Sequence, residues 1–299
     1  MMRLVATLLV RDEADIVAAT VEHHLAQGAA MVVATDNGSV DGTAEVLAEY
    51  AAAGVVDLIY EPDQTYRQAA WVTRMARRAA TEHGADWVVN LDADEFWLPR
   101  DRSLTLRSFL AGVPEEFDSI MAHRTDLLGV RGSSGPWPRR LRWRNLRTVS
   151  ERGTPLAPKV CHRANPEVQI AQGNHEVSGM ATMPGDPLEI YHVPLRSWPQ
   201  FRRKIANGGS SYAASTELDP EVGWHWRVDH ERLLSGELEG VFRARELGAP
   251  QVVARLIKGA LVRDSFLLHH LQRIERTAVR PDLLRAVLVG AGRPVGGHP

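Results

Sequence analysis

Residues 87–96 read WVVNLDADEF, an apolar run that leads straight into acidic residues. The first part, Trp87 to Leu91, has the length and composition of a strand that is buried on both faces. Asp92 and Asp94 follow at once, with one residue between them. Carboxylates collected at the end of a buried strand repel one another unless a cation neutralises them. The pattern therefore predicts a central strand whose carboxyl end is a binding site.

Before these residues, the chain repeats a strand–helix unit three times. We expect strands at residues 4–10, 31–35 and 55–60, each a short apolar run. We expect helices at residues 15–27, from 41 or 43 to 53, and at 67–83, each ended by a glycine: Gly28, Gly54 and Gly84. Strands that alternate with helices of this length form a parallel sheet with right-handed crossovers. The predicted fold class is α/β, with an open, mostly parallel, Rossmann-like sheet flanked by helices.

After residue 100 the pattern changes. Short β-prone runs, separated by turns rich in glycine and proline, occur at residues 119–122, 141–143, 168–171 and 188–193. The run 139–144 also alternates like a strand, with Arg142 and Arg144 on one face. From Ser197 onward the apolar residues have helical spacing. We expect a catalytic domain at residues 1–200 and a mainly helical extension, packed on it, at 201–299.

The composition narrows the class of protein. Of the 299 residues, 44% are hydrophobic and 24% are charged, which is ordinary for a soluble globular protein. The formal charge of -2 and the pI near 6.6 argue against nucleic acid as a partner. Cys161 is the only cysteine, so the chain forms no internal disulfide and no cysteine-rich zinc site.

The apolar runs are too short to cross a membrane. None reaches the roughly 18 residues of a spanning helix. The run at 4–10 is followed directly by Arg11-Asp12-Glu13 rather than by a cleavage site, which favours a buried strand over a signal peptide. We therefore expect a cytoplasmic protein, with the option of a peripheral position at the inner membrane face.

Acidic or polar clusters follow three of the four predicted strands, at residues 11–13, 36–43 and 92–95. Ligands of an open parallel sheet bind at the carboxyl ends of the strands, so these clusters should share one rim. Carboxylate oxygens of this kind suit Mg²⁺ or Mn²⁺. The chain has neither the glycine fingerprint of dinucleotide-binding folds nor a P-loop. A bridging metal is therefore the better explanation for how a diphosphate is held.

At these clusters the chain resembles the family 2 glycosyltransferases, which have the GT-A type of fold. Residues 36–43, DNGSVDGT, resemble the family's Asp-Asp-Gly-Ser-x-Asp-Gly-Thr segment, except that Asn37 replaces the second Asp. Residues 92–94 resemble its Asp-x-Asp motif. Residues 192–204, HVPLRSWPQFRRK, resemble a His-x-Pro-x-Arg-Ser-x-x-Gln-Phe-x-x-Lys segment of the bacterial branch whose acidic motif reads Asp-Ala-Asp-Glu-Phe. The resemblance covers roughly residues 3–208.

The resemblance implies a GT-A-like fold and a glycosyltransferase that takes a sugar from a nucleoside diphosphate sugar. The residues implied in binding the nucleotide sugar are Arg11, Glu13, Asp36, Arg74, Asp92 and Lys204. The residues implied in holding Mn²⁺ or Mg²⁺ are Asp92, Asp94 and His192. Arg196 and Arg202 are further cations for the diphosphate. The donor nucleotide would be UDP, GDP or dTDP, and the acceptor a small molecule, a glycan or a lipid-linked molecule.

Inversion at the anomeric carbon also needs a base that takes the proton of the acceptor hydroxyl. The candidates are Glu176, Asp186, Glu189 and His175. We favour Glu176, because residues 173–176, GNHE, form a compact polar cluster between strand-like segments; His175 is the alternative within the same cluster.

Simpler explanations stay open. Asp92 and Asp94 could cap the next helix, residues 36–43 could be an ordinary turn with Asp41 as a cap, and His192 could be a core histidine. Residues 139–144 fit a solvated face, or contact with an anionic acceptor or a membrane surface.

Two other functions also compete with sugar transfer. One is a nucleotidyltransferase that makes a nucleotide sugar, and the other is a non-catalytic nucleotide-sugar-binding relative. The C-terminal helices are compatible with a homodimer.

Overall fold

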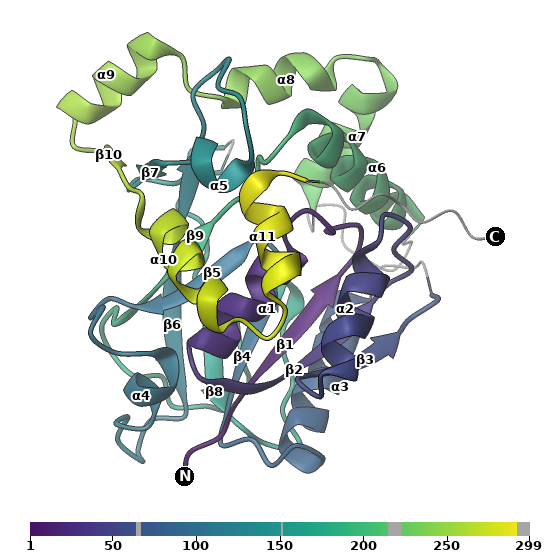
Figure 1. The fold of residues 1–299 in the computed structure, drawn as a ribbon, viewed down its shortest axis with the longest axis vertical. Coiled ribbons are helices and arrows are strands. Elements are labelled where there is room, and N and C mark those ends of the chain that lie inside the picture. Colours follow the sequence, from purple (N-terminus) through teal and green to yellow (C-terminus); the bar gives the residue numbers. More distant parts are fainter. Residues whose placement is uncertain (64–66, 151, 215–222, 292–299) are drawn as a thin grey trace.

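The computed structural model describes residues 1–63, 67–150, 152–214 and 223–291. Its N-terminal part is the predicted alternation of strands and helices (Figure 1). The strands are β1 (Leu4–Val10), β2 (Ala29–Asp36), β3 (Val56–Tyr60) and β4 (Trp87–Asp92). The helices are α1 (Val17–Ala26), α2 (Thr43–Ala52) and α3 (Gln68–Thr81).

The middle of the chain supplies the other half of the sheet. Its strands are β5 (Glu95–Pro99), β6 (Ser119–Leu128), β7 (Trp143–Asn145), β8 (Lys159–Arg163) and β9 (Leu188–His192). Its helices are short: α4 (Leu106–Leu110), α5 (Trp137–Arg140) and the 3₁₀ turn η1 (Gln172–Asn174). Where it is described, the C-terminal part is helical except for one strand, β10 (Leu261–Arg263). Its helices are α6 (Trp198–Ala214), α7 (Trp224–Leu234), α8 (Leu238–Arg245), α9 (Ala249–Ile257), α10 (Phe266–Ile274), the 3₁₀ turn η2 (Glu275–Thr277) and α11 (Pro281–Val289).

The ten strands of the described residues belong to one sheet. The order is β10-β7-β6-β8-β4-β1-β2-β3, and β9 pairs with both β5 and β6. β3, β2, β1 and β4 are parallel, whereas β8 joins β4 antiparallel and begins the second half. The predicted α/β class, an open sheet flanked by helices, is confirmed. The division of the chain at residue 200 stays a prediction; β10, which lies beyond it, pairs with β7.

Alternating side chains of the parallel strands build two apolar layers. Leu4, Ala6 and Leu8 of β1 face the core that α1, α2, α10 and α11 cover. Val5 of β1 faces the opposite side, where Met75 and its apolar neighbours on α3 pack. A strand whose residues are apolar on both sides is what a sheet covered by helices on both faces requires.

Helix α1 also fixes the acidic segment. The Thr20 hydroxyl donates to the carbonyl oxygen of Ala93 at 2.5 Å. Nε2 of His23 donates to the carbonyl oxygen of Trp97 at 2.9 Å. Both side chains are buried. Helix α1 therefore fixes the backbone of the turn between Asp92 and Asp94 and of the strand that follows it.

Several local predictions differ from the structure. Residues 137–140 are the short helix α5 rather than the start of a strand, because Pro136 and Pro138 suit a first helical turn. Residues 168–171 form only an isolated bridge, from Ile170 to Val177. Asp15 does not cap α1 through its side chain. Its carboxylate instead accepts a 2.8 Å hydrogen bond from Nε of Arg196.

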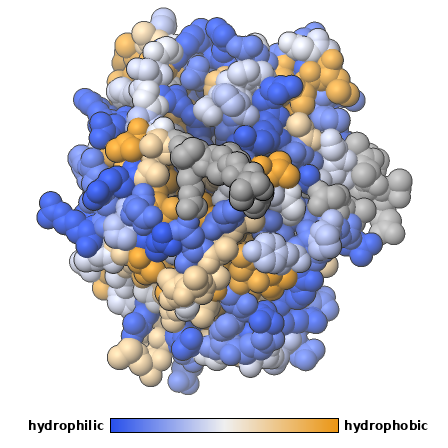
Figure 2. Space-filling model, turned by 45° about the vertical axis from the view of Figure 1, so that its right-hand side comes forward, coloured by the Kyte–Doolittle hydropathy of each residue, from blue (hydrophilic) through white to orange (hydrophobic). Residues whose placement is uncertain are grey.

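The surface seen in Figure 2 is mostly hydrophilic, with apolar side chains gathered in separate groups. Among the helices of the described ranges, none has both the length and the apolar character that crossing a bilayer needs.

Candidate active site

The carboxyl ends of β1, β2 and β4 bring the acidic clusters to one rim. In the parallel registers, Val10 at the end of β1 pairs with Asp36, and Leu9 pairs with Asp92. The backbone N–H of Glu13 donates to the Thr43 hydroxyl at 2.8 Å, which ties the segment after β1 to the start of α2. The rim expected from the sequence is therefore present.

Asp94 is the most heavily contacted carboxylate of the rim. It is buried, and its Oδ2 accepts a 2.5 Å hydrogen bond from Nζ of Lys204 on α6. Nε2 of His192 lies 3.6 Å from the same oxygen, and the guanidinium of Arg196 lies 3.9 Å away. Burial opposes ionisation, but Lys204 and His192 outweigh it and hold the pKa of Asp94 well below its usual range.

His192 is oriented by the sheet. It pairs with Asp126 across the β9–β6 ladder and with Glu95 across the β9–β5 ladder. Its Nδ1 donates to Oδ1 of Asp126 at 2.7 Å, so Nε2 is turned toward Asp94. Burial lowers the pKa of His192, but Asp94 and Asp126 outweigh it and raise the value to about 9.

Asp92 has a different cation. Nζ of Lys159, a fully buried side chain on β8, donates to Oδ2 of Asp92 at 2.5 Å and lies 3.4 Å from Oε1 of Glu95. Burial opposes ionisation of Asp92, yet Lys159 lowers its pKa below the usual value. For buried Glu95, burial outweighs Lys159 and raises the pKa.

Arg196 joins the segment after β1 to the segment after β9. Its guanidinium is fully buried and pairs with Glu13 and Asp15. Burial raises the pKa of Glu13 to about 7, against the attraction of Arg196 and Lys204. Among the described residues, Arg196 is the only guanidinium within ion-pair distance of either carboxylate, so its loss would leave Glu13 and Asp15 less compensated.

Three of the residues implied in nucleotide binding, Arg11, Asp36 and Arg74, lie on the side of the rim formed by β1, β2 and β3. Asp36 is buried; its Oδ2 accepts from the Ser39 N–H at 3.1 Å, and no described residue bonds its Oδ1. Nε of Arg11 is likewise buried without a partner among the described residues. Arg74 is held 2.9 Å from Glu61, just after β3. Asn37 donates to the carbonyl oxygens of Glu61 and Asp63, so it has a structural role.

The four candidates for the base differ in their surroundings. Asp186 and Glu189 form ion pairs with Arg100, and Glu189 also with Arg102 and Arg144. Glu176 is exposed.

His175 is half-buried and lies toward the acidic rim. Its Nδ1 donates to the carbonyl oxygen of Pro158 at 2.8 Å, so the neutral ring carries its lone pair on Nε2. Burial lowers the pKa of His175, and the nearby charges of Lys159 and Arg124 lower it further.

Gly173 makes room for that ring. Its φ is +77°, and a Cβ built there would lie 2.6 Å from Cδ2 and 2.7 Å from Nε2 of His175. A side chain at this position would therefore push His175 away from its bond to Pro158.

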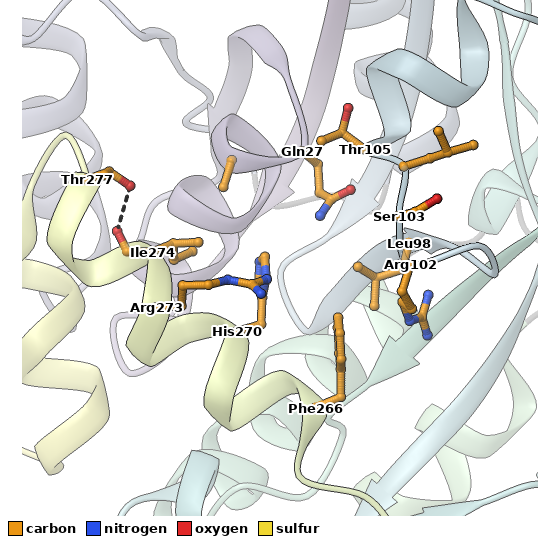
Figure 3. A pocket seen from close by; sticks show the side chains of 12 residues that line it. Gln27, Leu98, Arg102, Ser103, Thr105, Phe266, His270, Arg273, Ile274 and Thr277 are labelled. Carbon is orange, nitrogen blue, oxygen red and sulfur yellow. Dashed lines mark hydrogen bonds between the residues drawn. The ribbon is translucent and has the colours of Figure 1, made fainter.

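A cavity of about 420 Å³ lies away from the rim (Figure 3). It lies between the end of α1, the segment after β5 and helix α10, and His270 and Arg273 of α10 point toward each other there. None of the rim carboxylates lines it.

Sequence reasoning missed three residues of the rim, Lys159, Asp126 and Arg124. Composition held a signal for Lys159: only three of the 35 basic residues are lysines. Two of these three, Lys159 and Lys204, bond the two aspartates of the acidic motif. Asp126 had no local signal, because only the β6–β9 register brings it to His192.

Comparison with known proteins gives the following similarities. The sequence model of glycosyltransferase family 92 matches residues 5–123, less than half of the chain. No curated protein matches.

Three solved structures show low similarity. The crystal structure of S. aureus TarS 1-349 in complex with UDP is 12% identical, with a TM-score of 0.43, over 96% of this chain and 87% of that one. Glucosyl-3-phosphoglycerate synthase from Mycobacterium tuberculosis, in complex with Mg²⁺ and UDP, is 15% identical, with a TM-score of 0.29, over 41% of this chain and 44% of that one. A cytidylyltransferase from Leptospira borgpetersenii is 14% identical, with a TM-score of 0.30, over 41% of this chain and 54% of that one. The family match alone runs from β1 into β6 and so includes all three acidic strand ends.

Proposed function

We propose that this protein is a glycosyltransferase that moves a sugar from a nucleoside diphosphate sugar to a hydroxyl acceptor. The observation that carries the proposal is the meeting of Asp36, Asp92 and Asp94 at one rim, beside Lys204 and Arg196. On the β2 side the rim has hydrogen-bond acceptors that could bind the hydroxyl and N–H groups of a nucleoside. Near Asp94 it has cations that could bind a diphosphate. The match of glycosyltransferase family 92 to residues 5–123 supports the same activity.

The nucleoside would lie against β1 and β2. Oδ1 of Asp36 is a buried acceptor without a partner among the described residues, which suits a ribose hydroxyl or a base N–H. Arg11 offers an unpaired Nε at the end of β1. Arg74, held by Glu61, lies at the end of β3 on the outer side of this region.

The rim also suits Mn²⁺ or Mg²⁺. Oδ2 of Asp94 and Nε2 of His192 are 3.6 Å apart, and two ligands at about 2.1 Å from one ion lie roughly 3–4 Å apart. The bond from His192 to Asp126 is the usual way in which a metal-binding histidine is oriented.

No three His, Cys, Asp or Glu side chains in the described ranges form a ready metal cage.

Charge balance at the rim supports a divalent ion as well. Six carboxylates face five cationic groups, which are four lysine and arginine side chains and His192, whose pKa of about 9 keeps it protonated at neutral pH. The carboxylates are Glu13, Asp15, Asp92, Asp94, Glu95 and Asp126; the cationic groups are Arg124, Lys159, His192, Arg196 and Lys204. The raised pKa values of Glu13 and Glu95 reflect their burial, which the neighbouring cations do not offset. When bound, the ion would neutralise charge on the departing diphosphate.

Lys204 and Arg196 would act on the same leaving group. Lys204 reaches Asp94 from α6 and Arg196 reaches it from the segment after β9, so both cations border the expected diphosphate position. Fixed cations in a buried site stabilise charge that develops in the transition state more than water does. In this scheme Lys204 exchanges its contact with Asp94 for a contact with phosphate.

His175 is our candidate for the base, in preference to Glu176. The neutral ring, anchored through Nδ1 to Pro158, presents Nε2 as a proton acceptor. The acceptor oxygen would lose its proton to Nε2 as it attacks the anomeric carbon, and the bond to the diphosphate oxygen would break, with inversion.

Calorimetry with UDP, GDP and dTDP, each with and without Mn²⁺, tests the proposal. We expect one nucleotide to bind in a metal-dependent way, and Asp94→Asn to lose the metal dependence. Hydrolysis of the matching nucleotide sugar without acceptor is expected for a glycosyltransferase and not for a nucleotidyltransferase. The proposal is wrong if none of the nucleotides binds, or if binding ignores both the metal and Asp94.

A further inference from the structure

Two neighbouring segments of the chain contain basic residues and no acidic ones. Residues 127–150 contain six arginines and residues 247–263 contain two arginines and one lysine, without a single Asp or Glu. The segments touch: β7 pairs with β10, and Leu247 exchanges backbone hydrogen bonds with Gly129 and Arg131. We call residues 127–150 and 247–263 the basic apex. A chain of formal charge -2 thus concentrates positive charge at one end of its sheet.

Most of this charge is not neutralised by neighbouring carboxylates. Arg140 pairs with Glu246, and Arg144 pairs with Glu189 and Asp264. Across the described parts of the chain, the other basic residues of the apex have no carboxylate within ion-pair distance; they are Arg131, Arg139, Arg142, Arg147, Arg255, Lys258 and Arg263.

Apolar side chains are exposed on α9, which belongs to the basic apex. Helix α9 buries Val252 against Leu261 and Leu247, which fixes it to the sheet. Val253, Leu256 and Ile257 are 56%, 42% and 81% exposed, and their i, i+3, i+4 spacing places them on one stripe. Figure 1 shows α9 at a corner of the molecule, away from the helices that cover the sheet. Leu146, 40% exposed, is bonded through its N–H to Ala260 beside this stripe.

We propose that the basic apex docks on an anionic lipid bilayer. An apolar stripe flanked by lysine and arginine is the signature of a helix that lies in the membrane interface. The stripe can enter the acyl boundary, while Arg255, Lys258 and Arg263 contact lipid phosphates. A nucleic acid would satisfy the cations but would leave the three apolar side chains in water, so it fits the surface less well.

The basic apex lies close to His192 of the rim, so docking on a bilayer would bring that side of the rim near the membrane. His192 pairs with Asp126, Asp126 with Asn145 on β7, and Asn145 with Leu261 on β10. Three strand spacings of about 4.8 Å separate the histidine from β10. The nucleotide side, β2 and β3, is at the other end of the sheet. If the proposed function holds, a docked apex places the acceptor side of the rim next to the bilayer, which suits a lipid-linked acceptor.

Flotation with vesicles tests the docking. The full chain is mixed with vesicles of phosphatidylcholine alone, or of phosphatidylcholine with phosphatidylglycerol, at low and high salt. We expect binding only to the anionic vesicles, weakened by salt. The triple variant V253S/L256S/I257S should lose about a hundredfold in affinity through lost apolar burial. Lys258→Glu should lower the affinity for anionic vesicles about twenty-five-fold. The substitution changes the charge by two units, and each unit near the surface contributes about fivefold.

Matched variants outside the apex serve as controls. Leu234→Ser removes a side chain that is 76% exposed at the end of α7, and Arg276→Glu reverses a charge on η2. Both should bind vesicles like the parent chain.

The proposal is overturned if anionic vesicles do not bind the chain or if the apex variants bind as well as the controls. A second result would also overturn it. If vesicles do not bind, and ultracentrifugation shows a dimer of the parent chain that the triple variant no longer forms, the stripe is an interface between two copies of the chain. Vesicle binding needs no nucleotide, so its failure leaves the proposed reaction standing.

Discussion

Nζ of Lys204 lies 2.5 Å from Oδ2 of Asp94, although 110 positions separate the two residues in the chain. The contact joins α6 to the acidic motif after β4. It gives the motif a cation that belongs to the protein itself. If Mn²⁺ or Mg²⁺ binds Asp94 as proposed, it would compete with Lys204 for this carboxylate oxygen until a bound diphosphate took over the ammonium group.

Lys204→Met should move two affinities in opposite directions. Without nucleotide, Mn²⁺ should bind more tightly, because its competitor at Asp94 is gone. With Mn²⁺ present, the nucleoside diphosphate should bind about tenfold or more weakly, since a charged hydrogen bond to phosphate is lost. Calorimetry measures both. Weaker binding of the metal alone would contradict the competition.

Arg196→Met should destabilise the fold. The guanidinium is fully buried between Glu13 and Asp15, and removing it leaves carboxylates uncompensated, at a cost of about 3–5 kcal/mol. Arg285→Met is the matched control, because Arg285 pairs with Glu275 at the surface, where a pair contributes roughly 0–1 kcal/mol. Urea unfolding measures both. Equal losses in the two variants would argue against the buried network.

His175→Gln should lower kcat by about 10²–10⁴-fold and leave nucleotide affinity unchanged, because the general base is lost while the donor site remains. Glu176→Gln, at the adjacent exposed position, should change kcat little. Steady-state kinetics with the identified donor decides between them. If Glu176→Gln is the inactive variant, the base is Glu176 and our preference is wrong.

Gly173→Ala tests the position of the His175 ring. Both Gly173 (φ +77°) and Gly179 (φ +71°) have left-handed backbones, where a side chain costs about 1–2 kcal/mol. A Cβ meets His175 only at Gly173, and nothing lies within 4 Å of one at Gly179. Gly173→Ala should therefore lose activity as well as stability, and Gly179→Ala only stability. Equal kcat values would show that the ring position does not matter.

Acid should destabilise the protein through buried neutral histidines. Burial lowers the pKa values of His24, His162 and His270 to about 4. The unfolded chain, with histidine values near 6.5, then binds more protons, so stability is lost as pH falls from 6.5 toward 4. Each of these histidines can lower the free energy of unfolding by at most about 3 kcal/mol. Urea unfolding measures the free energy of unfolding at about pH 7 and at about pH 5. The decrease between the two pH values should be smaller in His270→Phe than in the control His123→Phe, whose histidine is exposed. Equal losses would contradict this cause.

The side of the rim that β1, β2 and β4 form could be predicted because its signals are local. β1, β2 and β4 are apolar runs, and the residues that follow them contain the carboxylates. Parallel pairing then brings Asp36 and Asp92 together without further information.

The other half of the rim depends on long-range pairing. Lys159 contacts Asp92 across 67 positions, and Asp126 contacts His192 across 66, both through ladders of the second half of the sheet. β5 and β8 are short strands without clear alternation, and β7 emerges from a run whose prolines favour α5. No local pattern specifies which residues of such strands face each other.

The scarcity of lysine has a practical consequence for chemical labelling. Of the three lysines, Lys159 is buried against Asp92 and Lys204 is bonded to Asp94, whereas Lys258 is exposed at the end of α9. Apart from the α-amino group, an amine-reactive dye at limiting dose would attach at Lys258. The chain thus has a nearly unique conjugation site on the basic apex, where a fluorophore would report the polarity of whatever α9 contacts.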